Sequence, residues 1–445
     1  MKRKTLIGLL AVFGLLLAAE LVFLGILSRR DGDTTVQDFT TSPTQDTTHA
    51  TAPAVTTIAT EPTGLPATEE AVATEPSETQ PREIRYTLTF AGDCTLASDS
   101  GSYNAAAGFI QTIGTDYGFP FRNVLDYFEQ DDFTIINLES VLADQGNAAG
   151  KLFTFRGPTA YTEIMTGSSV EAVTLANNHT ADYGKDGYAS TTKALTEAGV
   201  WFVEENKTTL VTTDRGLVIG LYADAFQLST DDIRNNIKKL QDAGAEVIIC
   251  AFHWGVEGSY RPTADQKKFA KAAIDAGADI VYGHHPHVLQ PIEEYNGGYI
   301  CYSLGNFSFG GNHYPRDLDS ALVQLEVIRD ESGTVSLGEL TIIPVSITSL
   351  SKQNNFQPTP YEKDTPEYQR TMSKLDGTFT GPDLVVNYDN LKPTEPPATE
   401  APTAPPAETQ PPATETPPAE QPPATEAPAA PENPAPPPAD SPDPS

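Results

Sequence analysis

Short apolar runs alternate with helical patterns through the middle of the chain. Runs of strand length, rich in Val, Ile, Thr, Phe or Tyr, occupy 86–91, 133–136, 172–175, 200–203, 247–252, 280–282, 299–304, 321–328 and 337–345. Apolar residues recur at helical spacing in 187–198, 233–243 and 263–276, and each of these segments ends in Ala-Gly before the next apolar run. Thr263 and Gln266 have the spacing of a capping box, and Gly277 is suited to end the helix. The order predicts an α/β fold with helices between strands.

The periodic region, 84–350, is long enough for one large domain. Residues 351–392 contain few periodic apolar positions. We expect them to form an extension that either packs on the domain or leads into a tail.

The first thirty residues are typical of a membrane segment. Lys2, Arg3 and Lys4 precede an apolar run over 6–27 in which Glu20 is the single charged residue. At 1.5 Å per residue this run spans about 30 Å, the thickness of the hydrocarbon core of a bilayer. A cleaved signal peptide has a shorter apolar region. We therefore expect a cytoplasmic basic stub and an uncleaved transmembrane anchor over 1–30, with the domain on the extracellular side.

Two segments, 31–83 and 393–445, consist mainly of Thr, Pro, Ala, Glu and Ser. They hold too little apolar surface to offset chain entropy, so we expect both to be disordered. Such tracts suit a spacer through a cell wall or a glycosylated stalk, and an inert solubilising tail is the alternative. The net charge of −32 argues against a nucleic-acid partner, because binding phosphates requires clustered Lys and Arg.

Residues able to bind a metal or transfer a proton follow five of the apolar runs. They are Asp93, Glu139, Asn178, His179, His253, His284, His285 and His287. In α/β sheets, ligands bind beyond the carboxyl ends of the strands, so we expect these side chains to converge. Pro286 fixes the backbone between His285 and His287, which favours two imidazoles directed at one point.

The expected site combines carboxylate, amide and imidazole donors without thiolate. The candidate metal ligands are Asp93, Glu139, Asn178, His253, His285 and His287. Such donors suit manganese, iron, cobalt or zinc, and they could hold one or two divalent ions. His179 would then protonate a leaving group or stabilise developing charge. The alternative is a histidine-lined fold without metal, in which these side chains point apart.

The motifs occur in an order that resembles a known family. Gly-Asp, Asn-Leu-Glu, Ala-Asn-Asn-His, His-Trp-Gly, Gly-x-His-Pro-His and Ser-Leu-Gly-Asn-Phe follow one another over about 85–345. This order resembles the CapA family of poly-γ-glutamate capsule synthesis proteins, which is itself similar to the calcineurin-like metallophosphoesterases. The resemblance implies a sandwich of two mixed β-sheets flanked by helices.

The resemblance also implies roles for single residues. Asp93 matches the first metal-binding aspartate and Glu139 the bridging acid, while the Asn178-His179 dipeptide and the later histidines match in turn. Residues that would line the pocket or support the ligands are Asn137, Arg156, Asn177, Trp254, His284 and Asn306. Three of these have other readings: Trp254 as a packed aromatic, Asn306 as a turn cap and Arg156 as the partner of a structural carboxylate.

Two positions depart from the phosphoesterase pattern. Those enzymes have Asp-x-His on the first strand, whereas this chain has Asp93-Cys94-Thr95, which lacks the imidazole. The bridging acid is Glu139 instead of aspartate. Phosphate-ester hydrolysis therefore does not follow from the resemblance.

Two hypotheses result. The first is an anchored, metal-dependent hydrolase of the CapA type that acts on an anionic envelope polymer or a phosphoester during capsule or cell-envelope synthesis. The second is a non-catalytic, metal-containing scaffold or polymer-escort subunit within a membrane capsule complex.

Overall fold

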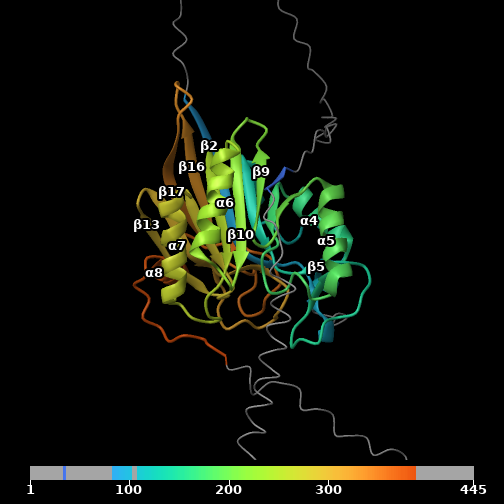
Figure 1. Cartoon of the computed structure of the whole chain (residues 1–445). Helices are drawn as coiled ribbons and strands as arrows, with labels where there is room; N and C mark the ends of the chain where they lie inside the picture. The colour runs from blue at the N-terminus through green and yellow to red at the C-terminus, as the bar shows by residue number, and fades with distance from the viewer. Residues whose placement is uncertain (1–33, 37–82, 103–107, 387–445) are drawn as a thin grey trace, which may run out of the picture. The chain divides into compact units, whose positions relative to one another are not determined.

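The structure is a computed structural model that describes residues 34–36, 83–102 and 108–386 (Figure 1). The expected membrane segment, most of the expected linker and the expected tail lie outside these residues. Within the described part of the chain, no helix is both long enough and apolar enough to span a bilayer.

The first of two large sheets has seven strands. In spatial order they are β1 (Thr34–Val36), β9 (Lys207–Thr212), β10 (Val218–Ala225), β11 (Val247–His253), β12 (Ile280–His284), β14 (Gly298–Leu304) and β13 (Leu289–Tyr295). The four strands from β10 to β14 are parallel, and β13 and β9 join them antiparallel. The backbone of β1, from the segment expected to be a disordered linker, pairs with β9.

The second sheet has eight strands and is also mixed. Its order is β18 (Thr359–Pro360), β17 (Val335–Ser346), β16 (Asp319–Arg329), β2 (Ile84–Thr95), β4 (Phe133–Leu138), β7 (Ala172–Thr174) and β8 (Trp201–Val203), with β15 (Asn306–Phe309) beside the end of β2. The strands from β2 to β8 are parallel. A small third sheet contains β3 (Ser98–Asp99), β6 (Phe155–Gly157) and β5 (Val141–Leu142).

The two large sheets share one apolar core, and helices cover their other faces. Side chains from both sheets, such as Leu88 and Ile249, belong to the shared core. Helices α6 (Thr230–Asp242) and α7 (Ala264–Ala276) pack on the first sheet and lie side by side in Figure 1. The second sheet is covered by α2 (Phe109–Ile113), α3 (Leu125–Glu129), α4 (Thr162–Thr166) and α5 (Gly184–Ala198). The expectation of an α/β fold with sheets flanked by helices is confirmed; the expected N-terminal helix lies outside the described residues.

The helix signals read from the sequence are present. Thr263 and Gln266 form the reciprocal hydrogen bonds of a capping box at the start of α7. Gly199 and Gly277 end α5 and α7 in the left-handed conformation, which glycine adopts without steric cost. Each glycine thus closes a helix shortly before the next strand begins.

Residues 351–386 pack on both large sheets: β18 pairs with β17 of the second sheet, and helix α8 (Pro366–Leu375) contacts β16 and β17 of the second sheet and β13 of the first. Four charged side chains hold them there: Asp317, Asp319, Arg370 and Lys374, which we call the Asp319 cluster. Arg370 donates two hydrogen bonds to Asp319, at 2.6 and 2.7 Å, and Lys374 donates one at 2.6 Å. Arg370 and Lys374 hold the pKa of Asp319 below its usual value although burial, the largest influence, acts to raise it.

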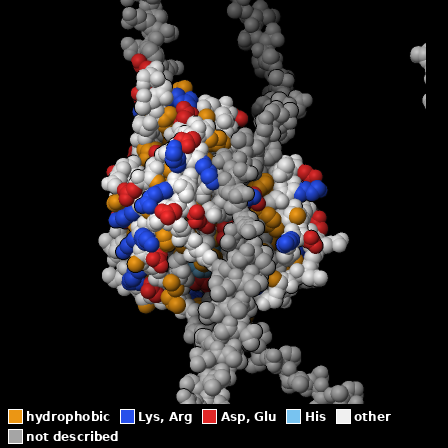
Figure 2. Space-filling view, viewed as in Figure 1, with side chains coloured by type: hydrophobic (Ala, Val, Ile, Leu, Met, Phe, Trp, Pro, Cys, Tyr) orange, Lys and Arg blue, Asp and Glu red, His pale blue; other side chains and the backbone are white. Residues whose placement is uncertain are grey.

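Charges of both signs cover the visible surface of the domain. Figure 2 shows Lys and Arg side chains interspersed with Asp and Glu over the face that carries α6 and α7. This face therefore lacks the continuous basic patch that phosphate-backbone binding requires.

Candidate metal centre

The predicted ligands lie where the shared core reaches the carboxyl ends of strands from both sheets. Side chains alternate along a strand, so residues two apart face the same side. Ala251 of β11 and Tyr282 of β12 lie in the shared core. His253 and His284, each two residues later, therefore point between the sheets, toward the second sheet and its strand β2.

A β-bulge directs Asp93 to the same place. Relative to β4, strand β2 holds one extra residue between Phe90 and Asp93. Phe90 faces the shared core whereas Cys94, which would face the same side in a regular strand, faces the helices. Gly92 permits this path because a Cβ there would lie 2.2 Å from the Gly305 carbonyl oxygen.

Asp93 is fully buried and contacts three residues of the histidine loop. Its carboxylate lies 2.9 Å from His284 Nδ1 and 3.1 Å from His287 Nδ1, and it accepts a 3.3 Å hydrogen bond from the His285 backbone N–H. Asn137 donates a further hydrogen bond at 2.9 Å. Burial is the largest influence and acts to raise the pKa of Asp93, but His284 and His287 together hold it well below its usual value.

Glu139 is fully buried and has no hydrogen bond to either carboxylate oxygen among the described residues. Two imidazole nitrogens lie close to this carboxylate, His253 Nε2 at 3.6 Å and His287 Nε2 at 3.8 Å. His253 Nε2 is likewise buried, and it has no hydrogen-bond partner in the described part of the chain. Burial raises the pKa of Glu139 well above its usual value and lowers that of His253 well below it. Unpaired groups of this kind are costly inside a protein unless a ligand satisfies them.

The histidine loop has an unusual backbone. His285 and His287 have φ values of 93° and 55°, a region that residues other than glycine rarely adopt. Such strain persists where the surroundings enforce it and occurs often at functional sites. Burial, the largest influence, lowers the pKa of His285 to about 4. It also acts to lower the pKa of His287, but Glu139 and Asp93 outweigh it and raise that pKa to about 10.

We call Asp93, Glu139, His253, His284, His285 and His287 the histidine–carboxylate cluster. Two sets of three residues could each hold an ion, because the ligand atoms within each set all lie within 4.8 Å of one another. One set is Asp93, Glu139 and His287, and the other is Glu257, His285 and His287. The sequence analysis missed Glu257, although it follows His253 by four residues, on the loop after β11. Because His287 belongs to both sets, the arrangement could hold one ion or two neighbouring ions.

His284, expected to support the ligands rather than join them, lies in contact with Asp93. The 2.9 Å distance from its Nδ1 to Asp93 Oδ1 is that of an ion pair, but its direction is not that of a hydrogen bond, and neither ring nitrogen has a hydrogen-bond partner among the described residues. His284 is thus a further candidate ligand near Asp93.

A chain of hydrogen bonds connects Asp93 to the loop of His179. Asn177 donates to Asn137 Oδ1 at 3.0 Å and accepts from the His179 backbone N–H at 3.0 Å, while Asn137 donates to Asp93. Asn178, a predicted ligand, has a buried side-chain oxygen with no hydrogen-bond partner in the described part of the chain. Asn137 and Asn177 therefore fix the loop of His179, and the side-chain oxygen of Asn178 stays available as a ligand.

His179 forms a pair with Asp182, which the sequence analysis also missed. His179 Nδ1 lies 2.7 Å from Asp182 Oδ2, and Asp182 also accepts from Lys151 Nζ at 2.5 Å and from the Phe155 N–H at 2.7 Å. Burial lowers the pKa of His179. At neutral pH the ring is therefore uncharged, with Nδ1 donating to Asp182 and Nε2 left for the pocket.

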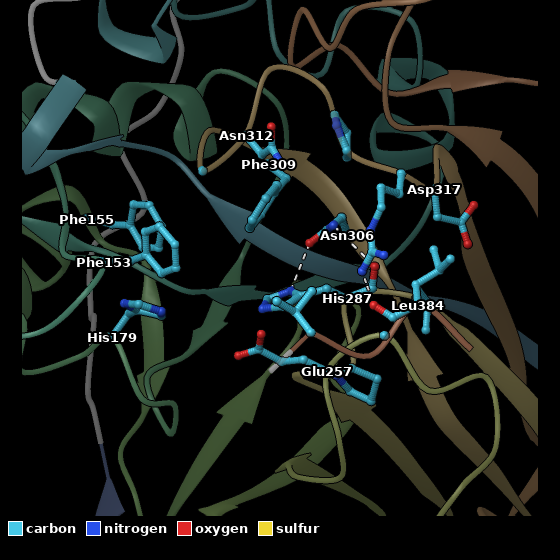
Figure 3. Close-up of a pocket in the computed structure, with 17 residues that line it drawn as sticks. Phe153, Phe155, His179, Glu257, His287, Asn306, Phe309, Asn312, Asp317 and Leu384 are labelled. Atoms are coloured by element: carbon cyan, nitrogen blue, oxygen red, sulfur yellow. Dashed lines mark hydrogen bonds between the residues drawn. The ribbon is translucent and has the colours of Figure 1, made fainter. Parts of the chain in front are cut away.

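A pocket with a volume of about 460 Å³ opens beside the cluster. Figure 3 shows His179 with Phe153 and Phe155 on one side, Asn306 and His287 in the middle, and Asp317 and Leu384 on the other side. Asn306 accepts a 2.9 Å hydrogen bond from His287 Nδ1. A substrate in this pocket would contact both His179 and the cluster.

Two predicted pocket residues lie away from these ligands. Trp254 packs in the core under α6 and α7, and its indole N–H donates to the Tyr302 carbonyl at 3.0 Å. Trp254 lies two residues after Phe252, so strand alternation directs both side chains to the helix-covered face of the sheet. Arg156 donates to the Ala143 carbonyl at 3.2 Å and lies over the Tyr183 ring. Neither residue lines the pocket.

The first strand provides no replacement for the missing imidazole. Thr95, at the expected histidine position, is buried. The Cys94 thiol is buried on the helix-covered face, and burial raises its pKa far above the usual value. A thiolate ligand at this position is therefore unfavourable.

Comparisons with known proteins agree with the motif order. The family model described as bacterial capsule synthesis protein PGA_cap matches residues 87–311, about half of the chain. The capsule biosynthesis protein CapA of Bacillus anthracis is 31% identical over 292 residues, covering 59% of this chain and 68% of that protein. The PGA biosynthesis protein CapA of Bacillus subtilis (strain 168) is 30% identical over 274 residues, covering 53% and 72%.

Among solved structures, the NAD nucleotidase NadN of Haemophilus influenzae is similar with a TM-score of 0.34 and 12% identity. The match covers 66% of this chain and 63% of that one. A likeness this small carries no argument about activity. The family match and the two CapA relatives do carry one: this chain belongs to the bacterial capsule synthesis protein PGA_cap family.

Proposed function

We propose that this protein is a metal-dependent, phosphoesterase-like hydrolase that acts during the synthesis of a poly-γ-glutamate-like capsule or another cell-envelope polymer. The capsule context comes from the family and from the CapA relatives. The hydrolase assignment comes from the histidine–carboxylate cluster and the neighbouring pocket.

One observation carries the proposal. Glu139 is fully buried with two carboxylate oxygens that have no hydrogen-bond partner among the described residues, and the imidazoles of His253 and His287 lie beside it. A carboxylate in this setting is unfavourable unless a cation accompanies it. Mixed carboxylate and imidazole donors fit manganese, iron or zinc.

The residues divide into two roles. Asp93, Glu139, Asn178, His253, His285 and His287, with Glu257 and His284 as additions, would hold the metal. A divalent ion bound there would lower the pKa of a coordinated water and neutralise a phosphoryl group. His179, oriented by Asp182 through Nδ1, would accept a proton at Nε2 from the attacking water and pass it to the leaving group. Asn137 and Asn177 keep the His179 loop in register with Asp93.

The position of the enzyme in the cell is part of the proposal. The apolar run at 6–27 and the flanking basic residues support a single-pass anchor in the cell membrane. The Thr- and Pro-rich segments support a domain on the extracellular side, where it could meet an anionic polymer and other subunits of a capsule-synthesis complex.

A non-catalytic role is the second candidate, and one observation favours it. The first strand lacks the imidazole of the phosphoesterase pattern, and neither Cys94 nor Thr95 replaces it. A weaker metal centre could then serve to bind an anionic polymer within the complex without cleaving it.

Turnover of bis(4-nitrophenyl) phosphate by the full chain in the presence of manganese distinguishes the two. For the hydrolase we expect metal-dependent turnover that falls about 10²–10⁴-fold in His179→Ala with unchanged metal content. His313→Ala is the matched control, because the His313 ring makes a tilted contact with the Phe356 ring and does not belong to the cluster. Bound metal without turnover would support the escort role, and absence of metal would reject both.

A further inference from the structure

The far end of the pocket is built by residues that follow the family-matched region. Arg316, from the loop between β15 and β16, lines this end together with Leu384 and Val386, from the segment after α8. The family match ends at residue 311. This end is therefore a feature of the chain beyond the matched motifs.

Arg316 is the one Lys or Arg among the residues that line the pocket. Its guanidinium donates a hydrogen bond to the Leu384 carbonyl oxygen and forms no ion pair with a carboxylate in the described part of the chain. A guanidinium has five N–H donors in a rigid fork. Most of these donors are therefore available for an acceptor in the pocket.

Neighbouring acids do not neutralise this arginine. Asp317 accepts from Lys374 Nζ at 2.7 and 2.8 Å and from the Tyr260 hydroxyl at 2.8 Å, so its charge is already paired. Glu257, the other acid of the pocket, groups with His285 and His287 at the cluster. A pocket anion would therefore meet an arginine whose charge is not yet paired.

The wall that positions Arg316 is held in place independently. Leu384 N donates to the Gly258 carbonyl at 2.7 Å. Arg261 pairs with Asp383 at 2.7 Å and donates to the Gly381 carbonyl at 3.0 Å. A donor fixed in advance loses less entropy when it binds a ligand.

We infer that this end of the pocket is a subsite for a second anionic group of the substrate and that Arg316 binds this group. The substrate class is an oligomer with repeated carboxylates or phosphates, one near the histidine–carboxylate cluster and the next at Arg316. The inference rests on the proposed function for the identity of the reacting group, whereas binding at Arg316 requires no metal.

Calorimetric titration of the full chain, with a chelator present, tests the subsite. The probes are a γ-linked glutamate tetramer, which supplies carboxylates, and inorganic tripolyphosphate, which supplies phosphates; a γ-linked glutamine tetramer is the neutral control. We expect at least one anionic probe to bind, and Arg316→Ala to weaken its binding roughly tenfold or more. Arg316→Lys should recover part of the loss, because lysine keeps the charge without the fork.

Arg261→Ala is the matched control. It removes one positive charge and loosens the same wall, but Arg261 does not line the pocket. We expect less than a twofold change in Kd for this variant. Equal losses in Arg261→Ala and Arg316→Ala would reduce Arg316 to a support of the wall, and unchanged binding in Arg316→Ala, or no binding of either anion, would overturn the subsite.

A parallel turnover assay with manganese separates this inference from the proposed function. Arg316-dependent anion binding without turnover would leave the subsite in place and reject the hydrolase. Turnover without Arg316-dependent binding would support the hydrolase and reject the subsite.

Discussion

Two buried groups of charged side chains lie in the same domain and differ in how their charges are satisfied. In the Asp319 cluster, Arg370, Lys374 and Tyr361 donate hydrogen bonds to Asp319. In the histidine–carboxylate cluster, neither carboxylate oxygen of Glu139 accepts a hydrogen bond from any residue that the structure describes. Burial acts on both acids, yet the pKa of Asp319 is lowered and that of Glu139 is raised.

The difference indicates two purposes. The Asp319 cluster is complete within the protein and holds residues 351–386 against the second sheet. In the histidine–carboxylate cluster, His287 lies 3.8 Å from Glu139 without a hydrogen bond, and buried imidazole nitrogens of His253, His284 and His285 have no hydrogen-bond partner among the described residues. A bound cation would satisfy the ligand atoms of the histidine–carboxylate cluster, whereas Arg370 and Lys374 already satisfy the carboxylates of the Asp319 cluster. Substitutions that remove one charge from each group test this distinction.

The largest effect on stability is expected for Asp319→Asn. The substitution removes the carboxylate partner of half-exposed Arg370 and one of the two carboxylates that pair with Lys374, which is 3% exposed and keeps Asp317. We expect the free energy of unfolding to fall by about 3 kcal/mol, the low end for breaking a buried pair, because Arg370 is partly solvated. Chemical denaturation measures this change. Asp242→Asn breaks an exposed pair with Lys238 and should cost less than about 0.5 kcal/mol, and an equal loss in both variants would contradict this account.

The equivalent substitution in the other cluster, Glu139→Gln, should leave stability nearly unchanged and remove metal binding. Burial already favours the neutral form of Glu139, so an uncharged amide of the same shape costs little in the metal-free protein. We expect affinity for Mn²⁺ to fall at least about a hundredfold, since even the partners of metal ligands contribute 10–100-fold. Calorimetry and denaturation on the same sample measure both quantities. Full metal affinity in Glu139→Gln would place the ion elsewhere.

Metal affinity should also depend on pH through His287. In the metal-free protein Glu139 and Asp93 raise the pKa of His287 to about 10, so the ring is charged at pH 7 and must lose its proton to bind an ion. We expect His287 to release about one proton per ion at pH 7, in addition to the proton that Glu139 loses, and affinity to rise at least about tenfold per pH unit below pH 10. Titrations in buffers with different ionisation enthalpies count the protons. The charged ring stabilises the metal-free fold below pH 6.5, and this contribution is lost as pH rises through 10. The same number of protons released in His287→Asn as in the original protein would show that His287 is not a source of the proton.

A smaller effect is expected for Glu171→Gln, far from either cluster. Burial raises the pKa of Glu171 to about 8, and its carboxylate accepts from the Thr134 N–H at 2.7 Å. A raised pKa stabilises the fold below about pH 4.5, and this contribution is lost as the pH rises through 8. The variant should therefore match the original protein in stability at pH 4 and exceed it at pH 9 by at least about 1 kcal/mol, the equivalent of one unit of pKa. An equal difference in stability between the variant and the original protein at pH 4 and at pH 9 would contradict the raised pKa of Glu171.

Local signals in the sequence predicted the elements that have strong periodicity. The runs before Asp93, Glu139 and His253 are strands in the structure, and the capping box at Thr263 is present. Strand alternation also explains why His253 faces the ligands and Trp254 does not. The bulge that turns Asp93 depends on the pairing of β2 with β4, which no local pattern reports.

Contacts between distant segments could not be predicted in the same way. Glu257 and Asp182 had local signals, because they follow His253 by four residues and His179 by three. Arg316 had none: its position at the pocket depends on Leu384, sixty-eight residues later, and on the packing of α8. Tertiary packing, rather than periodicity, sets that end of the pocket.

Direct titration of Mn²⁺ into the chelator-treated full chain at pH 7.5, followed by calorimetry and elemental analysis, is the most direct test of the central claim. We predict saturable binding of one or two ions, lost in Glu139→Gln and kept in Asp242→Asn. A folded protein that binds no divalent ion, or that binds it equally in both variants, would contradict a metal centre at the histidine–carboxylate cluster.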